Sequence, residues 1–175
     1  MRKIIKYIGL DVHKDSIAIA IAEEGRERDV NFYGTIKNDM SQLHKFIRKQ
    51  ISQGVEPQCV YEAGPCGYTI YRSLSNKGIE CVVVAPSLIP RKSGDRIKTD
   101  RRDSESLAKL HRAGELTAVY VPSIEDEAFR DIVRFREDSV NAQKRAKQQL
   151  GAFLLRHHIC YSGKSKWSKA YFNWL

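Results

Sequence analysis

The order of strand-like and helix-like segments is the strongest constraint on how this chain folds. Three runs near its start, at residues 3–12, 16–22 and 28–36, are rich in β-branched and aromatic residues, and short connections join them. These runs predict an antiparallel meander. After them, helix-like and strand-like segments alternate. A meander followed by such alternation predicts a mixed sheet with helices on its faces.

The faces of this sheet can be assigned in part. The second run, SIAIAIA, alternates isoleucine with alanine, so one face of that strand is bulky and the other is small. A helix capped by Asp39 or Ser41 follows the meander, and another begins at Gly67 and stops at Gly78. Two further strands are predicted over residues 58–61 and 79–85.

A basic loop and a further helix complete the pattern. Residues 86–99 contain two prolines and a glycine and are predicted to form the loop. Residues 100–113 are predicted to form a helix closed by Gly114. This order of elements is that of the α/β ribonuclease H-like fold, a mixed sheet with flanking helices. Actin-like ATPases share the core order, so the fold alone does not determine the function.

Four carboxylates fall at the ends of predicted elements. Asp11 ends the first strand and Glu62 follows the fourth, so parallel pairing of these strands would bring both to one sheet edge. Asp100 and Asp103 share a face at the start of the helix after the loop. Clustered carboxylates repel one another unless cations compensate, and hard oxygen ligands select Mg²⁺ or Mn²⁺. Such ions support nuclease or strand-transfer chemistry at a phosphodiester.

Each carboxylate also has an ordinary structural explanation. Asp11 fits a strand-end turn, and Glu62 fits a solvated loop. Asp100 and Asp103 fit the cap and first turn of a helix, where the helix dipole favours acidic residues. Their joint appearance at the expected strand and helix ends favours a shared site over four separate roles.

The chain is strongly basic, with a formal net charge of +9. A basic domain of this kind often binds a polyanion, and basic residues gather beside the acidic positions and on the long helix that follows. A solvated charge run explains part of this pattern. The candidate nucleic-acid contacts are Lys14, Arg91, Lys92, Arg96, Lys98, Arg101, Arg102, Arg134, Lys144, Arg145 and Lys147.

From residue 125 to about 157 the pattern predicts one long helix with a narrow apolar stripe. Such a stripe packs on a partner helix more often than in a core, so we expect an arm that dimerises or packs on parts of a longer protein. The predicted division is a catalytic domain over 1–122, the arm over 123–160, and a tail or the start of a further domain over 161–175. No apolar run is long enough to cross a bilayer and no secretory signal is present, which predicts a cytoplasmic protein.

Several segments, in order, resemble a known family. They are IGLDVHKDS, YEAGPCGY, VVAPSLIPRKSGDRIKTDRRDSESLAKL and AVYVPS. Together they resemble the N-terminal half of the DEDD transposases of bacterial insertion sequences, which are related to the Piv DNA invertases. The resemblance covers at least residues 8–122 and includes the K-T-D-x-x-D segment, and the basic long helix is similar to the family's helical linker.

The resemblance has specific implications. It implies a RuvC-like catalytic domain in which Asp11, Glu62, Asp100 and Asp103 bind the metal and are catalytic. It implies Mg²⁺ (or Mn²⁺) as the cofactor, with phosphodiester cleavage and strand transfer on DNA at element ends and targets. It also implies a structured guide RNA encoded by the element, and homodimers or tetramers on nucleic acid.

One departure affects these expectations. Members of the family carry a C-terminal domain that contributes a serine nucleophile, and neither Ser104 nor Ser162 matches that motif. We therefore expect a fragment that folds and binds metal and nucleic acid without recombining DNA alone. The alternatives are a stand-alone resolvase or ribonuclease of the same fold, an actin-like kinase or ATPase, and a non-catalytic nucleic-acid-binding or dimerisation module. The glycine-rich phosphate loops that a kinase needs are not found in the sequence.

Overall fold

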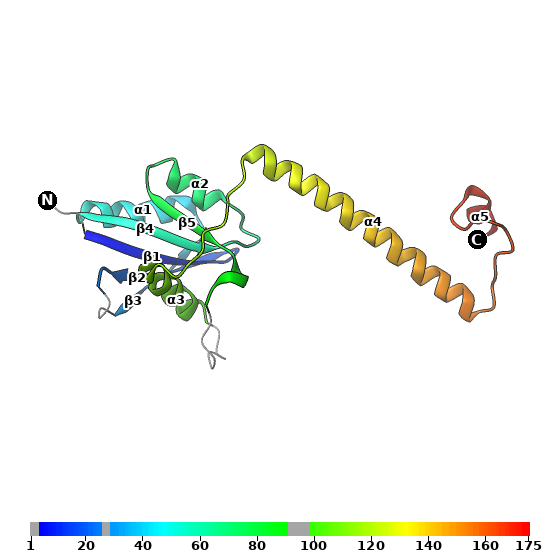
Figure 1. Cartoon of the computed structure of the whole chain (residues 1–175), viewed down its shortest axis with the longest axis horizontal. Coiled ribbons are helices and arrows are strands. Elements are labelled where there is room, and N and C mark those ends of the chain that lie inside the picture. Colours follow the sequence, from blue (N-terminus) through cyan, green and yellow to red (C-terminus); the bar gives the residue numbers. More distant parts are fainter. Residues whose placement is uncertain (1–3, 26–28, 91–98) are drawn as a thin grey trace. The chain divides into compact units, whose positions relative to one another are not determined.

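The computed structural model describes residues 4–25, 29–90 and 99–175 and divides the chain into two compact units, Met1–Val121 and Pro122–Leu175. The first unit is built on a five-stranded sheet in the order β3-β2-β1-β4-β5 (Figure 1). β1, β2 and β3 pair antiparallel, whereas β4 pairs parallel with β1 and β5 parallel with β4. The strands are β1 Ile4–Val12, β2 Ser16–Glu23, β3 Val30–Lys37, β4 Val55–Glu62 and β5 Glu80–Val84.

Helices cover both faces of this sheet (Figure 1). Buried residues of α1 and α2 pack on one face, and buried residues of α3 pack on the other. The predicted meander, mixed sheet and flanking helices of the ribonuclease H-like fold are therefore confirmed. The helices of this unit are α1 Met40–Ser52, α2 Thr69–Ser75, the short 3₁₀ helix η1 Pro86–Leu88, and α3 Asp100–Ala113.

The two faces differ in the size of the side chains that they offer. On β2, Ile17 and Ile19 enter the main core with α1 and α2. Ala20 and Ala22 point the other way and pack against Ala108 of α3. The alternation of isoleucine and alanine predicted this difference, and the small face leaves room for a helix to lie close to the sheet.

The fourth strand is longer than the sequence predicted. It begins at Val55 rather than at residue 58 and includes Pro57, which lies opposite Lys6 of β1. Pairing of β4 with β5 starts only at Gln58. Pro57 therefore lies where β4 is locally an edge strand, and its missing N–H removes no hydrogen bond from the sheet.

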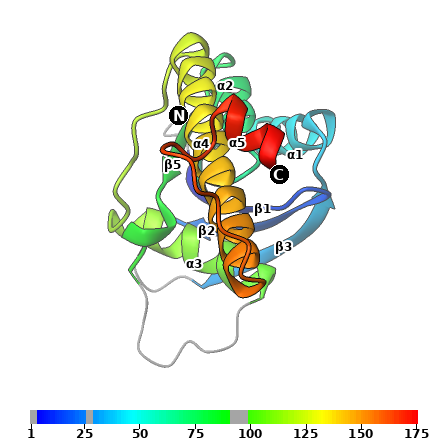
Figure 2. The ribbon, with the colours of Figure 1, turned by 90° about the vertical axis from the view of Figure 1, so that its right-hand side faces the viewer.

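The second unit consists of α4 (Ile124–Arg156) and a C-terminal segment that contains the short helix α5 (Lys169–Trp174). Ser123 caps α4, because its hydroxyl accepts a hydrogen bond from Asp126 N at 3.0 Å. The sequence predicts a tail or the start of a further domain over residues 161–175, and in the structure Tyr171 of α5 is buried among other aromatic rings. Figure 2 shows this segment turning back after the end of α4.

Within the described ranges, none of the helices combines the length and the apolar character that crossing a bilayer requires.

Candidate metal centre at the sheet edge

Asp11 and Glu62 lie at the same edge of the sheet. β1 and β4 run parallel, and their register pairs Leu10 with Tyr61, so the next residue of each strand is a carboxylate. Leu10 and Tyr61 belong to the core beneath α1 and α2. Because side chains alternate along a strand, Asp11 and Glu62 are both on the face that α3 covers.

α3 approaches this face closely because β1 carries a glycine. A Cβ on Gly9 would lie 2.6 Å from Ala108 N and even closer to Ser104 O, both in the backbone of α3. Ser104 and Ala108 are themselves small and fully buried. The close approach brings the first turn of α3, with Asp100 and Asp103, to the end of β1.

Thr99 sets the start of this helix. It is the N-cap, and its hydroxyl accepts a hydrogen bond from Arg102 N at 3.3 Å. Asp100 is therefore the first helical residue and not the cap, and both aspartates lie where the helix dipole favours a negative charge.

Replacement of Thr99 by alanine is expected to remove this cap and to lower the free energy of unfolding by about 1 kcal/mol. Urea denaturation followed by circular dichroism measures the change. Thr117→Ala, at an exposed position outside the helices and strands, is the matched control and should unfold like the unmodified chain. Equal effects of the two substitutions would show that the Thr99 cap contributes nothing.

His13 links Asp11 to Asp100. Its Nε2 lies 3.0 Å from Asp11 Oδ2 and 3.4 Å from Asp100 Oδ1. One ligand atom from each of the three residues falls within 4.8 Å of the others, close enough for a single ion. The Asp11 side chain is 15% exposed and the Asp100 side chain 60% exposed, so the centre opens towards solvent on the α3 side.

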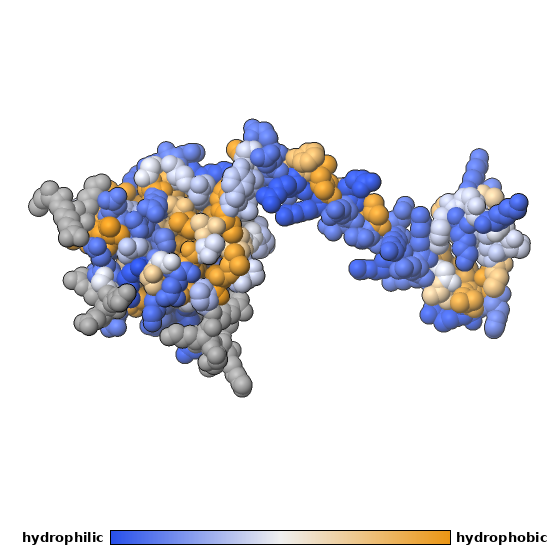
Figure 3. Space-filling model, in the orientation of Figure 1, coloured by the Kyte–Doolittle hydropathy of each residue, from blue (hydrophilic) through white to orange (hydrophobic). Residues whose placement is uncertain are grey.

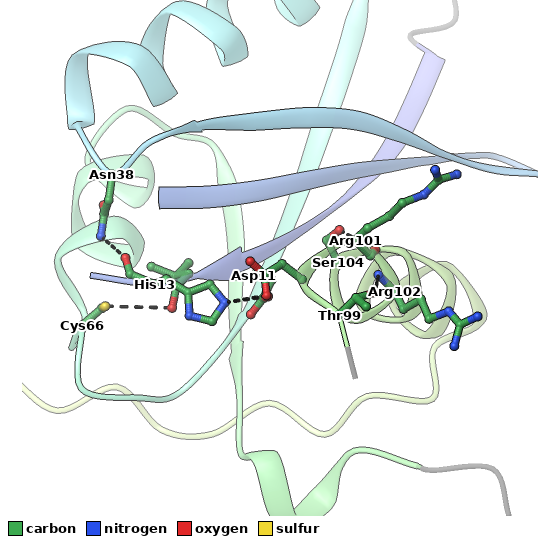
Figure 4. Close-up of polar contacts among 10 residues, drawn as sticks. Asp11, His13, Asn38, Cys66, Thr99, Arg101, Arg102 and Ser104 are labelled. Atoms are coloured by element: carbon green, nitrogen blue, oxygen red, sulfur yellow. Dashed lines mark hydrogen bonds and ion pairs between the residues drawn. The ribbon is translucent and has the colours of Figure 1, made fainter. Parts of the chain in front are cut away.

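The turn between β1 and β2 holds His13 in place. His13 N donates to Ser16 O at 2.8 Å, and the amide of Asn38 donates to His13 O at 2.7 Å. Figure 4 shows the imidazole pointing towards Asp11. His13 was not among the site residues predicted from the sequence. The available signal was its position two residues after Asp11 at a strand end, since residues i and i+2 of a strand share a face.

Glu62 and Asp103 are not part of the group formed by Asp11, His13 and Asp100. In the described part of the chain, the group of ligating side chains that close together contains only Asp11, His13 and Asp100. Glu62 ends β4 and pairs with Val84, and Asp103 is half-buried in the first turn of α3. The structure therefore brings together two of the four predicted carboxylates and places the other two on the adjoining strand end and helix turn.

Hydrogen bonds hold the loop after Glu62 in place. Tyr61 donates its hydroxyl to Gly67 O at 3.1 Å. Burial raises the pKa of Tyr61 well above its usual range, so the side chain remains a neutral donor. Ala63 N also donates to Val84 O at 2.8 Å, which extends the β4–β5 pairing past Glu62. The Glu62 backbone is thus held on both sides.

Those predicted nucleic-acid contacts that the structure describes lie on different elements. Arg101 donates to Glu105 at 2.9 Å and lies over the Phe32 ring at 5.5 Å. Figure 4 shows the Arg101 and Arg102 side chains directed away from Asp11, and Lys14 is exposed in the β1–β2 turn. Arg91, Lys92, Arg96 and Lys98 lie outside the described residues, and Arg134, Lys144, Arg145 and Lys147 are on α4.

The donor set fits a divalent cation. Asp11 and Asp100 offer the hard oxygen ligands that Mg²⁺ and Mn²⁺ prefer, and the His13 nitrogen suits Mn²⁺ better than Mg²⁺. Close approach of two carboxylates is unfavourable unless a positive charge compensates it. A cation bound between them would provide that charge.

The chain is similar to several known proteins. T. thermophilus RuvC, solved in complex with a Holliday junction substrate, matches 67% of this chain and 100% of its own, with a TM-score of 0.45 and 10% identity. Putative transposase y4qE of Sinorhizobium fredii (strain NBRC 101917 / NGR234) is 47% identical over 169 residues, which are 97% of this chain and 43% of that protein. The transposase for insertion sequence element IS1533 of Leptospira borgpetersenii is 39% identical over 171 residues, 97% of this chain and 49% of that protein.

The chain thus spans less than half the length of these curated relatives. A family model described as a transposase matches residues 8–159, which include the second half of β1, the strands β2 to β5, α3 and α4. The chain therefore belongs to the DEDD transposase family.

Proposed function

We propose that the first unit is the metal-dependent catalytic unit of a DNA transposase. The observation that carries this proposal is the convergence of Asp11 and Asp100, from a strand end and a helix start, on one group with His13. Asp11 and Asp100 would hold the cation, Mg²⁺ or Mn²⁺, and Glu62 and Asp103 would supply further oxygen ligands. When bound, such a cation polarises a phosphodiester and helps to generate the attacking oxygen.

The residues of the chain have separate tasks in this proposal. Asp11 is fixed by the sheet, whereas the position of Asp100 depends on how α3 is placed over Gly9. His13 Nε2, which lies 3.0 Å from Asp11 Oδ2, would be a nitrogen ligand of the same cation. The exposure of Asp100 leaves the centre open to a large substrate such as a DNA strand.

The finer parts of the proposal concern the whole protein. They are strand transfer at the ends of an insertion sequence, direction by an element-encoded guide RNA, and assembly as a homodimer or tetramer through α4. The net charge of +9 supports a polyanionic partner. Exposed apolar side chains along α4, which include Phe129, Ile132 and Phe135, support helix pairing (Figure 3). A serine nucleophile would come from the part of the relatives that this chain does not span.

Mn²⁺ is expected to raise the melting temperature of the chain. A cation that binds only the folded state, at a hundred times its dissociation constant, stabilises it by about 2.7 kcal/mol. Differential scanning calorimetry with and without Mn²⁺ measures the shift, with NaCl at equal ionic strength as the control. Because His13 offers a nitrogen, Mn²⁺ should act at lower concentration than Mg²⁺. A folded chain that melts at the same temperature in Mn²⁺ and in the NaCl control would contradict a preformed metal centre.

A further inference from the structure

Charge is unevenly distributed along the second unit. The first part of α4, residues 124–138, carries six acidic and three basic residues. From residue 139 to the end of the chain there is no acidic residue. This stretch contains seven basic residues, Lys144, Arg145, Lys147, Arg156, Lys164, Lys166 and Lys169. An anionic partner is therefore attracted to the distal half of α4 and the C-terminal segment, and repelled from the first half of α4.

A groove lies within this positive region. It has a volume of about 480 Å³ and runs between the distal half of α4 and the start of the C-terminal segment. Its lining combines three lysines, two glutamines and one tryptophan with small or apolar residues. The lining residues include Gln143, Lys144, Lys147, Lys166 and Trp167.

Trp167 is held at the groove in an uncommon backbone conformation. Its φ is 65°, in the left-handed region that large side chains rarely adopt. The indole packs against the buried Tyr171, with ring centroids 4.9 Å apart, and is itself only half-buried. Such strain persists only where the surrounding structure imposes it, and it is common at ligand sites.

The ammonium group of a lysine lies over the Trp167 ring. Lys147 Nζ lies 5.6 Å from the indole centroid and donates to Gln143 Oε1 at 3.3 Å. Lys144 and Lys166 line the same groove. A flat aromatic surface surrounded by ammonium groups matches a nucleotide, which offers a base to stack and a phosphate to pair. The bases of a duplex are already stacked on each other, so a single strand is the form that fits.

We infer that this groove binds single-stranded nucleic acid, with one base stacked on Trp167 and the flanking phosphates paired with Lys144, Lys147 and Lys166. The inference rests on the proposed function only in that the chain acts on nucleic acid. It does not depend on the metal centre, which lies in the other unit. Among the nucleic-acid contacts predicted on α4, the inference excludes Arg134, because Arg134 lies in the acidic half of that helix.

Tryptophan fluorescence of the full chain tests the stacking directly, because the chain has two tryptophans. Trp174→Phe leaves Trp167 as the reporter, and Trp167→Phe leaves Trp174. Oligothymidylate or oligouridylate of about 12 nucleotides, within the usual range of single-strand sites, is added in EDTA. We expect quenching when Trp167 is present and little change when only Trp174 remains. Tighter binding of the ribo-oligomer assigns the groove to RNA, and tighter binding of the deoxy-oligomer assigns it to DNA.

Affinity provides a second measurement. By fluorescence anisotropy, Trp167→Ala should weaken binding of the same oligomers roughly tenfold, and Trp167→Phe should restore part of the loss. Lys147→Gln should lower the slope of log affinity against log salt by about 0.7. Arg130→Gln removes an equal charge from the acidic half of α4 and is the matched control, with unchanged binding expected.

Two results would overturn the inference. One is equal quenching of both single-tryptophan variants, and the other is loss of affinity in Arg130→Gln as large as that in Lys147→Gln. The Trp174→Phe measurement needs no change in the groove, so it holds even if Trp167→Ala disturbs the packing of the C-terminal segment. Because EDTA is present throughout, failure of the metal proposal leaves these results unaffected, and the Mn²⁺ melting experiment tests that proposal without any oligomer.

Discussion

Asparagine in place of Asp11 is expected to weaken Mn²⁺ binding by the chain on the order of a hundredfold or more. Loss of a residue that only supports a metal ligand already costs about ten- to a hundredfold, and Asp11 is proposed to be a ligand itself. Asparagine keeps the shape of the side chain and removes its charge. The first unit should therefore remain folded, since the core of Leu10, Ile17 and Ile19 is unchanged.

Electron paramagnetic resonance of free Mn²⁺ measures this affinity without requiring catalytic activity. Asp15→Asn is the matched control, because Asp15 is an exposed aspartate in the same β1–β2 turn and lies outside the group formed with His13. It should bind Mn²⁺ like the unmodified chain. If both variants retain the affinity of the unmodified chain, Asp11 is a structural strand-end residue and the proposed centre does not exist.

The location of Asp11 and Glu62 could be predicted because it follows from local patterns. An apolar run that ends in a carboxylate identifies a strand end, and the order of elements predicts that the first and fourth strands are parallel neighbours. The register of Leu10 with Tyr61 bears out that reasoning. The bounds of α3 also agree with the prediction, since Thr99 and Gly114 are recognisable start and stop residues.

The distances at the centre could not be predicted in the same way. They depend on the placement of α3, which is decided by contacts between Gly9 and residues almost a hundred positions later in the chain. No local pattern specifies such a contact. The role of His13 depends on the same placement, because its Nε2 meets Asp100 only when α3 lies close to the sheet.

The C-terminal segment shows a different limit of prediction from sequence. The sequence predicts residues 161–175 only as a tail or the start of a further domain, and in the structure Tyr171 is buried by Tyr161, Trp167 and Trp174. Rings that cluster in this way replace the regular apolar spacing by which short helices are recognised in a sequence. Ser168, which caps α5 through Tyr171 N at 3.3 Å, was the available signal.

Alanine in place of Gly9 is expected to lower the free energy of unfolding of the first unit by about 3 kcal/mol, because the added methyl group would overlap the α3 backbone. The φ of Gly9 is not in the left-handed region, so alanine fits the strand itself. Apart from the overlap, alanine would favour the folded state by roughly 0.5–1 kcal/mol in a strand. A net decrease in the free energy of unfolding would therefore be caused by the close approach of α3 to Gly9.

Urea denaturation and Mn²⁺ titration of Gly9→Ala together separate packing from positioning. Gly64→Ala is the matched control in the same unit, since a Cβ there would meet no atom nearer than Glu62 O at 4.0 Å. If α3 delivers Asp100 to the centre, the Gly9 variant that remains folded should also bind Mn²⁺ more weakly, although every proposed ligand is still present. A variant that is destabilised but binds Mn²⁺ with full affinity would show that Asp11 and its neighbours hold the cation without the close approach of α3.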